Sequence, residues 1–253
     1  MPDPAFRDHF SAQAGGYAVF RPTYPESLFA AIVALAPARR LAWDCATGNG
    51  QAAGALAPHF QRVIATDGST AQLAAATPYP NVEYRLATAE QSGLDSGSVD
   101  LITVAQALHW FELPAFGREA ERVMVPGGVL AIWGYLLAEI TPEIDTLILA
   151  LHNDIVGPYW PAGRDALLNR YEGLDLPFEK LAAPSAHMEH HWDLAQLMGY
   201  LGTWSAVAAY RQQRGSDPLA LVHSQFEQAW GDPSRVRAVR WPLHLHLYRK
   251  HVA

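Results

Sequence analysis

The 253-residue sequence contains a single cysteine, Cys45, so no disulfide can form within the chain. No stretch approaches the run of about 18 consecutive apolar residues that a membrane-spanning helix needs. Its beginning lacks the basic and then apolar pattern of a secretory signal. Basic residues are too few for a protein that coats DNA, because 18 Lys and Arg face 25 Asp and Glu, a formal net charge of −7. We therefore expect a cytoplasmic protein that binds neither nucleic acid nor a membrane.

Apolar residues are abundant, at 50% of the sequence, whereas charged residues make up only 17%. This composition excludes a highly charged, disordered chain. A chain of this length can bury roughly 70–75% of the surface that its unfolded form exposes. We expect one compact unit with a substantial hydrophobic core.

Segments with strand and helix patterns alternate along the first half of the chain. Each short apolar segment is followed by a loop and then by a stretch in which apolar residues have helical spacing. Strands joined by helices imply right-handed crossovers and a mainly parallel sheet covered on both faces. The sequence predicts an α/β, doubly wound fold, with strands at 41–43, 62–66, 82–86, 99–104 and 129–133 and helices at 25–35, 51–57, 69–76 and 114–124.

The pattern is less regular after residue 135. A strand-like alternation surrounds Pro242, and because a proline inside a strand favours an edge or a bulge, we expect this strand to be peripheral. The expected elements are helices near 143–155, 164–171, 194–210 and 219–230, a short strand at 178–181 and the strand at 236–247.

A loop of small residues, 44–51, joins the first expected strand to the helix that follows it. Glycines in such a loop let the backbone approach a ligand closely, and the start of the helix offers free amide donors. A nucleotide-like ligand is the natural expectation. Residues 48–53 also fit the dinucleotide fingerprint, so this loop alone does not separate NAD from other adenosine ligands.

Carboxylates at the strand ends favour S-adenosylmethionine over NAD as the adenosine ligand. Asp44 would repel a pyrophosphate but would tolerate the sulfonium and amino groups of S-adenosylmethionine, although it could also cap the next helix. Asp67 can accept from both hydroxyls of an adenosine ribose, although Asp67-Gly68 could also be a simple turn. Ala89-Glu90 follows the third strand, where it could meet adenine, although Glu90 could equally be a solvated loop residue.

Aromatic residues and histidines after the fourth strand are candidates for binding a second substrate. His109 could serve as a base or a hydrogen-bonding group, with Trp110 as a wall; the alternative is a packed aromatic cluster. Trp133 and Trp204 are further substrate candidates. Arg21 and Arg211 are candidate anchors for an acidic acceptor. The remaining histidines show no recognisable metal-ligand spacing, so no metal site is expected at His187, His190, His191, His244 or His246.

These motifs together resemble a class I S-adenosylmethionine-dependent methyltransferase of the small-molecule type, close to the trans-aconitate methyltransferases and their type 11 methyltransferase domain. One departure is Ala46, where the family's loop has its first glycine; alanine costs little there if φ stays negative. The resemblance rests on residues 44–51, Asp67, Ala89-Glu90, 99–102, 106–110 and 126–128, with weaker similarity at 17–25 and 203–206.

The resemblance implies a Rossmann-like sheet of seven strands, the last antiparallel, with the donor lying across the ends of strands one to four. It implies an N-terminal lid or helix at 1–36, a cofactor-binding core at 40–135, helical insertions on the acceptor side at 136–235 and an edge strand at 236–253. Gly48 and Gly50 would line the methionine part, and Gln106 would close the pocket. The full donor set is Tyr17, Arg21, Asp44, Ala46, Gly48, Gly50, Gln51, Asp67, Gly68, Ala89, Glu90 and Gln106.

The sequence therefore predicts methyl transfer from S-adenosylmethionine to a small organic acceptor, leaving S-adenosylhomocysteine. In-line displacement mainly requires alignment of the acceptor, so a catalytic base such as His109 is needed only if the acceptor must lose a proton. Two alternatives stay open at this point: a non-catalytic protein that binds the donor or its product, and an NAD-dependent oxidoreductase. The sequence does not indicate an oligomeric state.

Overall fold

A sheet of eight strands crosses the part of the chain that the computed structural model describes, residues 22–252, in the order β3-β2-β1-β4-β5-β8-β6, with β7 paired to β8 off this path. Strands β1 to β5 are parallel, and β6, β7 and β8 pair antiparallel. Their bounds are β1 Leu41–Cys45, β2 Arg62–Asp67, β3 Val82–Leu86, β4 Val99–Ala105, β5 Met124–Gly134, β6 Glu179–Leu181, β7 Ala186–Trp192 and β8 Arg237–Arg249.

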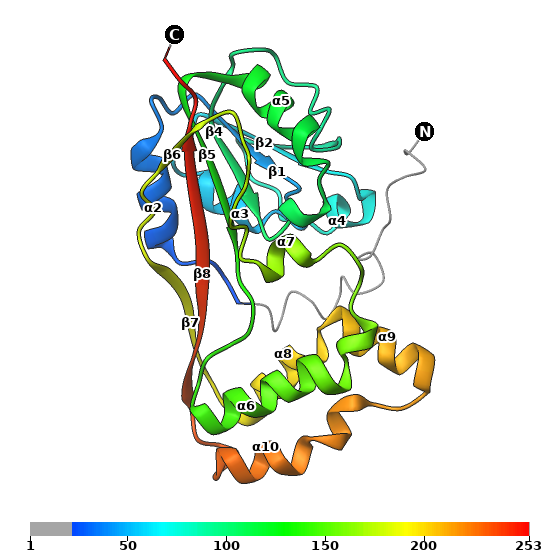
Figure 1. Cartoon of the computed structure of the whole chain (residues 1–253). Helices are drawn as coiled ribbons and strands as arrows, with labels where there is room; N and C mark the ends of the chain where they lie inside the picture. Colours follow the sequence, from blue (N-terminus) through cyan, green and yellow to red (C-terminus); the bar gives the residue numbers. More distant parts are fainter. Residues whose placement is uncertain (1–21, 253) are drawn as a thin grey trace.

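Helices cover both faces of the parallel strands, because successive strand residues point to opposite faces. Ala42 packs in one core with α2 (Glu26–Leu35) and α3 (Gln51–Leu56). Trp43 packs in a second core with α5 (Leu113–Val123). Figure 1 shows α2 and α5 on opposite sides of the sheet. The doubly wound arrangement expected from the alternating pattern is therefore confirmed.

Side chains at the helix starts explain where several helices begin. Ser69 accepts a hydrogen bond from the N–H of Gln72 at the start of α4 (Thr70–Ala74), and Glu112 does the same for α5. Such caps satisfy amide groups that have no partner within the helix. At the opposite edge of the sheet, buried Asp100 accepts from the backbone N–H of Arg40 at 2.8 Å and pairs with its guanidinium, which fixes the start of β1 beside β4.

A helical layer faces the carboxyl ends of the parallel strands, at the bottom of Figure 1. It is joined to the sheet by β8, the long red strand, whose first part pairs with β7 and whose last part pairs with β5. No helix within residues 22–252 is long and apolar enough to span a membrane. The helical layer comprises α6 Pro142–Ala150, a π turn Leu151–Ile155, α8 Leu194–Gly202, α9 Ser205–Arg214 and α10 His223–Trp230, and the short helix α7 Asp165–Leu168 lies between this layer and the sheet.

Two expectations about the second half were wrong. The sheet has eight strands rather than seven, because the histidine-rich segment Ala186–Trp192 forms β7. The strand around Pro242 is internal, not peripheral. It tolerates the proline because Arg240 exchanges backbone bonds with Glu139 and His244 pairs with Gly134, so residue 242 lies in the gap between these contacts.

Candidate active site

A cavity of about 1220 Å³ lies between the carboxyl ends of the parallel strands and the helical layer. It exceeds the roughly 300–1,000 Å³ of most small-molecule sites, which leaves room for two ligands side by side. Two parts can be distinguished. The strand-end part is lined by residues from 46–52, 67–69, 72, 85–93, 105–107 and 110–112, and the helical-layer part by residues from 135–137, 152, 160–167 and 200–205, with His109 between them.

The loop after β1 needs unusual backbone conformations. Gly48 and Gly50 have φ of +58° and +85°, and a Cβ on Gly50 would lie 2.4 Å from the Tyr84 hydroxyl. Ala46 also has positive φ, +54°, so the condition under which alanine would cost little at this position is not met. An L-residue in this region is strained by roughly 1–2 kcal/mol. The loop holds its shape even though its first position lacks a glycine.

Asp44, at the end of β1, links this loop to the neighbouring strand β4. Its carboxylate is fully buried and accepts from the Thr47 hydroxyl at 2.5 Å and from the Thr103 hydroxyl at 2.7 Å. Burial raises the pKa of Asp44 to about 6, although the two threonine bonds oppose the rise. Asp44 is not among the residues that line the cavity. The carboxylate therefore orders the loop and does not reach the space where a ligand would lie.

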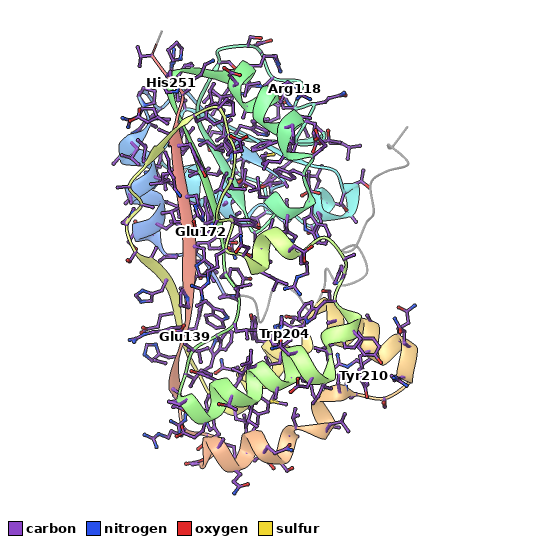
Figure 2. The ribbon with its side chains drawn as sticks, in the orientation of Figure 1. Arg118, Glu139, Glu172, Trp204, Tyr210 and His251 are labelled. Atoms are coloured by element: carbon purple, nitrogen blue, oxygen red, sulfur yellow. The ribbon has the colours of Figure 1, made fainter. Side chains whose placement is uncertain are left out.

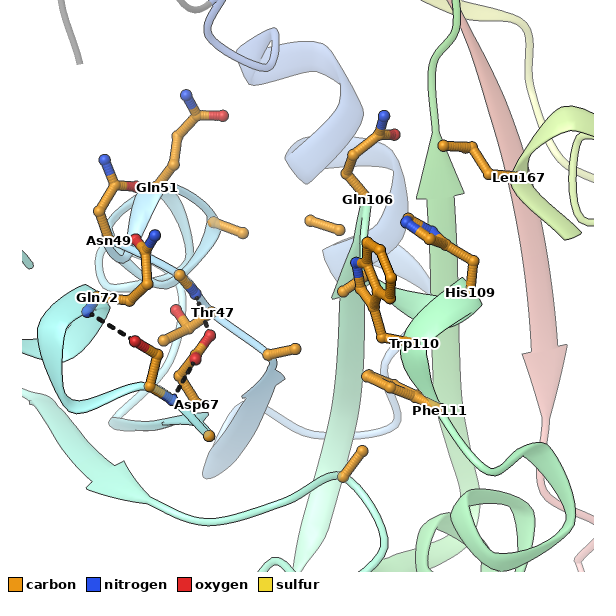
Figure 3. A pocket seen from close by; sticks show the side chains of 18 of the residues that line it. Thr47, Asn49, Gln51, Asp67, Gln72, Gln106, His109, Trp110, Phe111 and Leu167 are labelled. Atoms are coloured by element: carbon orange, nitrogen blue, oxygen red, sulfur yellow. Dashed lines mark hydrogen bonds between the residues drawn. The ribbon is translucent and has the colours of Figure 1, made fainter. Parts of the chain in front are cut away.

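Asp67, at the end of β2, does line the cavity. Its two carboxylate oxygens accept from backbone N–H groups, one from Gly48 and one from Ser69, each at 2.8 Å. Figure 3 shows these bonds, with Thr47 and Gln72 beside them. A carboxylate has about four acceptor positions, and these two bonds take one on each oxygen. They fix the orientation of the carboxylate at the end of β2.

Hydrogen bonds also fix the segments that follow β3 and β4. Gln106, with φ of +55°, donates to the carbonyl of Tyr135 at 2.9 Å and accepts from its N–H at 2.7 Å, which ties the end of β4 to the end of β5. Glu90 accepts from the N–H of Glu112 at 3.0 Å. Gln51, at the start of α3, donates to the carbonyl of Pro22. These contacts make a rigid rim around the strand-end part.

His109 lies on the 3₁₀ turn Leu108–Trp110, with its Nδ1 atom 2.9 Å from the Tyr171 hydroxyl. Burial lowers the pKa of His109 to about 4, and the positive charge of Arg164 lowers it further. The imidazole is therefore neutral at pH 7. The Arg164 guanidinium carbon stacks 3.9 Å from the Trp160 ring centre, and Trp204 packs 5.6 Å from that same ring.

The sequence matches the family described as a methyltransferase domain over residues 43–132. A Dictyostelium discoideum protein that carries a methyltransferase name is 35% identical over 259 aligned residues, covering 99% of this chain and 98% of that protein. A solved structure from Anaeromyxobacter dehalogenans, described as a type II methyltransferase, matches with a TM-score of 0.87 and 41% identity over 93% of this chain and 100% of that one. This chain belongs to the class I S-adenosylmethionine-dependent methyltransferases.

A more distant relative of this methyltransferase is a Saccharomyces cerevisiae protein named as S-adenosylmethionine-dependent, 26% identical over 64% of this chain and 60% of that protein. The family assignment confirms the fold and the reaction class expected from the motifs and removes the oxidoreductase alternative. The trans-aconitate subgroup stays a prediction, because none of these names specifies that substrate.

Most of the expected site residues of the methyltransferase line the cavity, but four do not. Trp133 is fully buried in β5 against Tyr24 and Phe29 and is a core residue. Arg211 pairs with Asp217 away from the cavity. Gly50 and Asp44 are not among the residues that line it, and Tyr17 and Arg21 lie outside the described residues. The expected residues that line the cavity are Ala46, Gly48, Gln51, Asp67, Gly68, Ala89, Glu90, Gln106, His109, Trp110 and Trp204.

Sequence reasoning missed the polar residues of the helical-layer part. Arg164 lines the cavity, and Tyr171 contacts His109 across 62 positions of sequence. No spacing rule links residues so far apart on separate loops. The one available signal was the aromatic run Tyr159-Trp160, whose role the sequence left undecided.

Proposed function

We propose that this methyltransferase transfers the methyl group of S-adenosylmethionine to a small organic acceptor, and that both bind side by side in the cavity described above. The observation that supports this most directly is the division of one continuous cavity of about 1220 Å³ into a polar strand-end part and an aromatic helical-layer part. A donor and an acceptor that share a cavity can meet without crossing solvent.

The strand-end part fits the donor by its chemistry. Asp67 offers both carboxylate oxygens to the ribose hydroxyls, held in place by Gly48 and Ser69. Ala89 and Glu90 lie where adenine would be bound, and the N-terminal end of α3 would face the methionine part.

The residues of the chain act mainly by alignment in the proposed reaction. S-adenosylmethionine supplies an electrophilic methyl group on a positively charged sulfur. Trp160, Trp204 and Leu167 would hold the acceptor behind that methyl group, and orientation of this kind can lower a barrier by up to about 7–11 kcal/mol. The helical layer would keep water out of the reacting region. In-line displacement needs no other cofactor.

The helical-layer part supports a small molecule as the acceptor. Its walls come from four separate segments, which contribute Tyr135, His152, Trp160 and Trp204. Aromatic walls on several sides suit a compact organic molecule that can be enclosed.

A binding measurement tests the donor assignment. Asp67→Ala should weaken S-adenosylhomocysteine binding by about 10- to 150-fold in isothermal titration, because bonds from a charged acceptor are worth about 1.5–3 kcal/mol. Asp67→Asn, which keeps one acceptor oxygen, should lose less, and Asp95→Ala, on an exposed loop, should bind normally. Unchanged binding by Asp67→Ala would show that the ribose is not held there.

A turnover measurement separates the enzyme from a non-catalytic donor-binding protein. The protein is incubated with methyl-labelled donor and a metabolite extract, and mass spectrometry identifies compounds that gain one CH₂, the net change when CH₃ replaces H. The expected result is a labelled small molecule that forms with wild type and fails to form with Asp67→Ala. Tight donor binding without any labelled compound would favour the non-catalytic alternative.

A further inference from the structure

His152 lies where α6 continues into the π turn Leu151–Ile155. In this turn the N–H of Val156 donates to the carbonyl of Leu151 at 3.0 Å, so the turn holds one residue more than an α-helical turn. Single π turns of this kind are rare and often occur at functional sites. The His152 carbonyl accepts from the Trp160 indole N–H at 3.1 Å, which ties the following loop to the turn and fixes the position of His152.

The His152 ring forms part of the wall of the cavity. Its centroid lies 4.8 Å from the ring of Trp160 and 5.7 Å from that of Trp204, and all three residues line the helical-layer part. Figure 2 shows Trp204 on the side of the helical layer that faces the sheet. His152 also borders a second hollow of about 390 Å³, whose lining includes the exposed residues Asn153 and Asp165. The imidazole therefore lies between the cavity and solvent.

The neighbouring residue determines which nitrogen of His152 carries the proton. The side-chain oxygen of Asn153 lies 2.7 Å from Nδ1 of His152. An amide oxygen can only accept a hydrogen bond, so Nδ1 must donate. Burial lowers the pKa of His152, although the hydrogen bond to Asn153 opposes this change. The ring is therefore neutral at pH 7, and Nε2 has a free electron pair.

This electron pair can be reached from the cavity. Within residues 22–252, Nε2 has no hydrogen-bond partner, and it is not one of the buried polar atoms left without a partner. Nδ1 faces Asn153, which lines the second hollow but not the cavity. Because the two ring nitrogens point in different directions, Nε2 is left on the side of the ring that lines the cavity.

Other groups around the helical-layer part are not available as bases. No carboxylate from residues 22–252 lines this part of the cavity. His109 lines the cavity, but its Nδ1 lies 2.9 Å from the hydroxyl of the buried Tyr171. A buried hydroxyl proton needs an acceptor, so Nδ1 of His109 accepts it and Nε2 carries the ring proton. Among the described residues of this part, His152 is the neutral base that can accept a proton.

We propose that His152 is the general base of the methyl transfer, and that the acceptor is a planar organic molecule whose nucleophile is an O–H or N–H group that keeps its proton at pH 7. This inference rests on the proposed function and defines the acceptor class for that site. Nε2 of His152 takes the proton while the oxygen or nitrogen of the acceptor forms the new bond to the methyl carbon. The carbon–sulfur bond breaks with its electron pair going to sulfur, and the imidazolium then releases its proton to solvent at the second hollow. Asn153 is the positioning residue that holds the tautomer.

The tautomer can be observed directly by NMR. In wild type with bound S-adenosylhomocysteine at neutral pH, long-range ¹H–¹⁵N spectra of ¹⁵N-histidine-labelled protein should show His152 with Nδ1 protonated and Nε2 unprotonated. His152→Gln identifies the signals. Asn153→Ala should give a mixture of tautomers, whereas Asn153→Asp and the exposed control Gln212→Ala on α9 should keep the wild-type pattern. A proton on Nε2 in wild type would overturn the inference.

A turnover measurement tests the acceptor class and the base. The labelled compound that wild type forms from methyl-labelled donor and the metabolite extract should survive mild alkali, because methyl ethers and N-methyl groups are stable there, whereas methyl esters are hydrolysed. His152→Gln should slow its formation by about 100-fold or more, the lower range for a general base, with normal S-adenosylhomocysteine binding. His223→Gln is the matched control, an exposed histidine on α10, and should form the compound at the wild-type rate.

The possible outcomes separate this inference from the proposed function. A label that mild alkali releases would show that the acceptor is a carboxylate, which needs no base, and would overturn the inference while leaving the proposed function intact. Formation of the compound by His152→Gln at the wild-type rate would do the same. A wild type that binds S-adenosylhomocysteine but labels no compound would refute the proposed function itself, and the base with it.

Discussion

The two parts of the cavity are built differently. The strand-end part comes from consecutive strand-to-helix connections, and backbone groups such as the N–H of Gly48 define its shape. The helical-layer part comes from scattered segments, and side chains such as Trp160, Arg164 and Trp204 define it. Backbone geometry constrains the sequence through glycine and spacing, whereas a side chain that forms a wall can be replaced by another of similar size without changing the path of the backbone. Under the proposed function, the first part would therefore hold the donor that the family shares, and the second would determine the choice of acceptor.

The largest expected effects concern two tryptophans that the sequence placed in the acceptor site together. Trp133 and Trp204 are 0% and 4% exposed, so replacing either by alanine should lower the free energy of unfolding by about 3–5 kcal/mol in urea titrations. Only Trp204 lines the cavity. Trp204→Ala should therefore also reduce formation of the labelled compound from the metabolite extract, whereas folded Trp133→Ala should form it normally.

The phenylalanine variants provide the control for this pair. The indole N–H of Trp133 has no hydrogen-bond partner among the described residues, so Trp133→Phe should destabilise the protein far less than Trp133→Ala. Reduced formation of the labelled compound by Trp133→Phe would contradict its assignment to the core.

The two parts should also respond to pH in opposite directions. The pKa of Asp44 is raised from 3.8 to about 6, so the folded state keeps a proton that the unfolded state loses, and stability falls as pH rises from about 4 to 6. The pKa of His109 is lowered from 6.5 to about 4, so the unfolded state binds the extra proton, and stability is lost as pH falls from about 6.5 to 4. Each shift corresponds to about 3 kcal/mol at most.

Single variants separate these two contributions. Relative to wild type, Asp44→Asn should become more stable as pH rises from about 4 to 6, and His109→Gln should become less stable over the same interval. Unfolding free energies from urea titrations at several pH values measure both. Two variants with the same pH dependence as wild type would show that neither group is perturbed as described.

The strand-end part was also the part that the sequence predicted well. Strand-and-helix alternation and the loop 44–51 identified the fold, and positions such as Asp67, Glu90 and Gln106 were found because they follow strand ends, which meet at one edge of a parallel sheet. The prediction that Asp44 contacts the donor failed because sequence position shows that Asp44 is at a strand end but not where its side chain points. The carboxylate points to the Thr103 hydroxyl on the neighbouring strand β4 and away from the cavity.

The helical-layer part could not be predicted in the same way. The partner of His109 is Tyr171, which lies at a turn where Arg170 and Tyr171 itself have positive φ. Neither position is a glycine, so the sequence does not mark this turn. Trp133 and Trp204 look alike in sequence, and only the packing around each one separates a core residue from a wall of the cavity. Pairings of this kind depend on tertiary structure alone.

A smaller effect tests the backbone control of the strand-end part. Gly50→Ala should destabilise the protein by about 2–3 kcal/mol, since positive φ costs about 1–2 kcal/mol and the new Cβ would displace Tyr84, whose hydroxyl donates to the carbonyl of Thr77. Gly97→Ala is the matched control: its φ is +62°, but no atom lies within 4 Å of the new Cβ. Equal losses of unfolding free energy in the two variants would show that contact with Tyr84 does not matter.

The smallest expected effect is a gain. Ala46 has φ of +54°, so Ala46→Gly relieves backbone strain, although glycine loses more entropy on folding; the net expectation is a rise of about 0.5–1 kcal/mol in unfolding free energy. Ala30→Gly, on the exposed side of α2, should instead lose about 1 kcal/mol. Because Ala46 lines the strand-end part, S-adenosylhomocysteine binding is measured alongside. If Ala46→Gly is more stable and binds S-adenosylhomocysteine at least as well as wild type, the strain at this loop position does not serve donor binding. Weaker binding of S-adenosylhomocysteine would mean that alanine's restricted backbone helps to hold the loop in its binding shape.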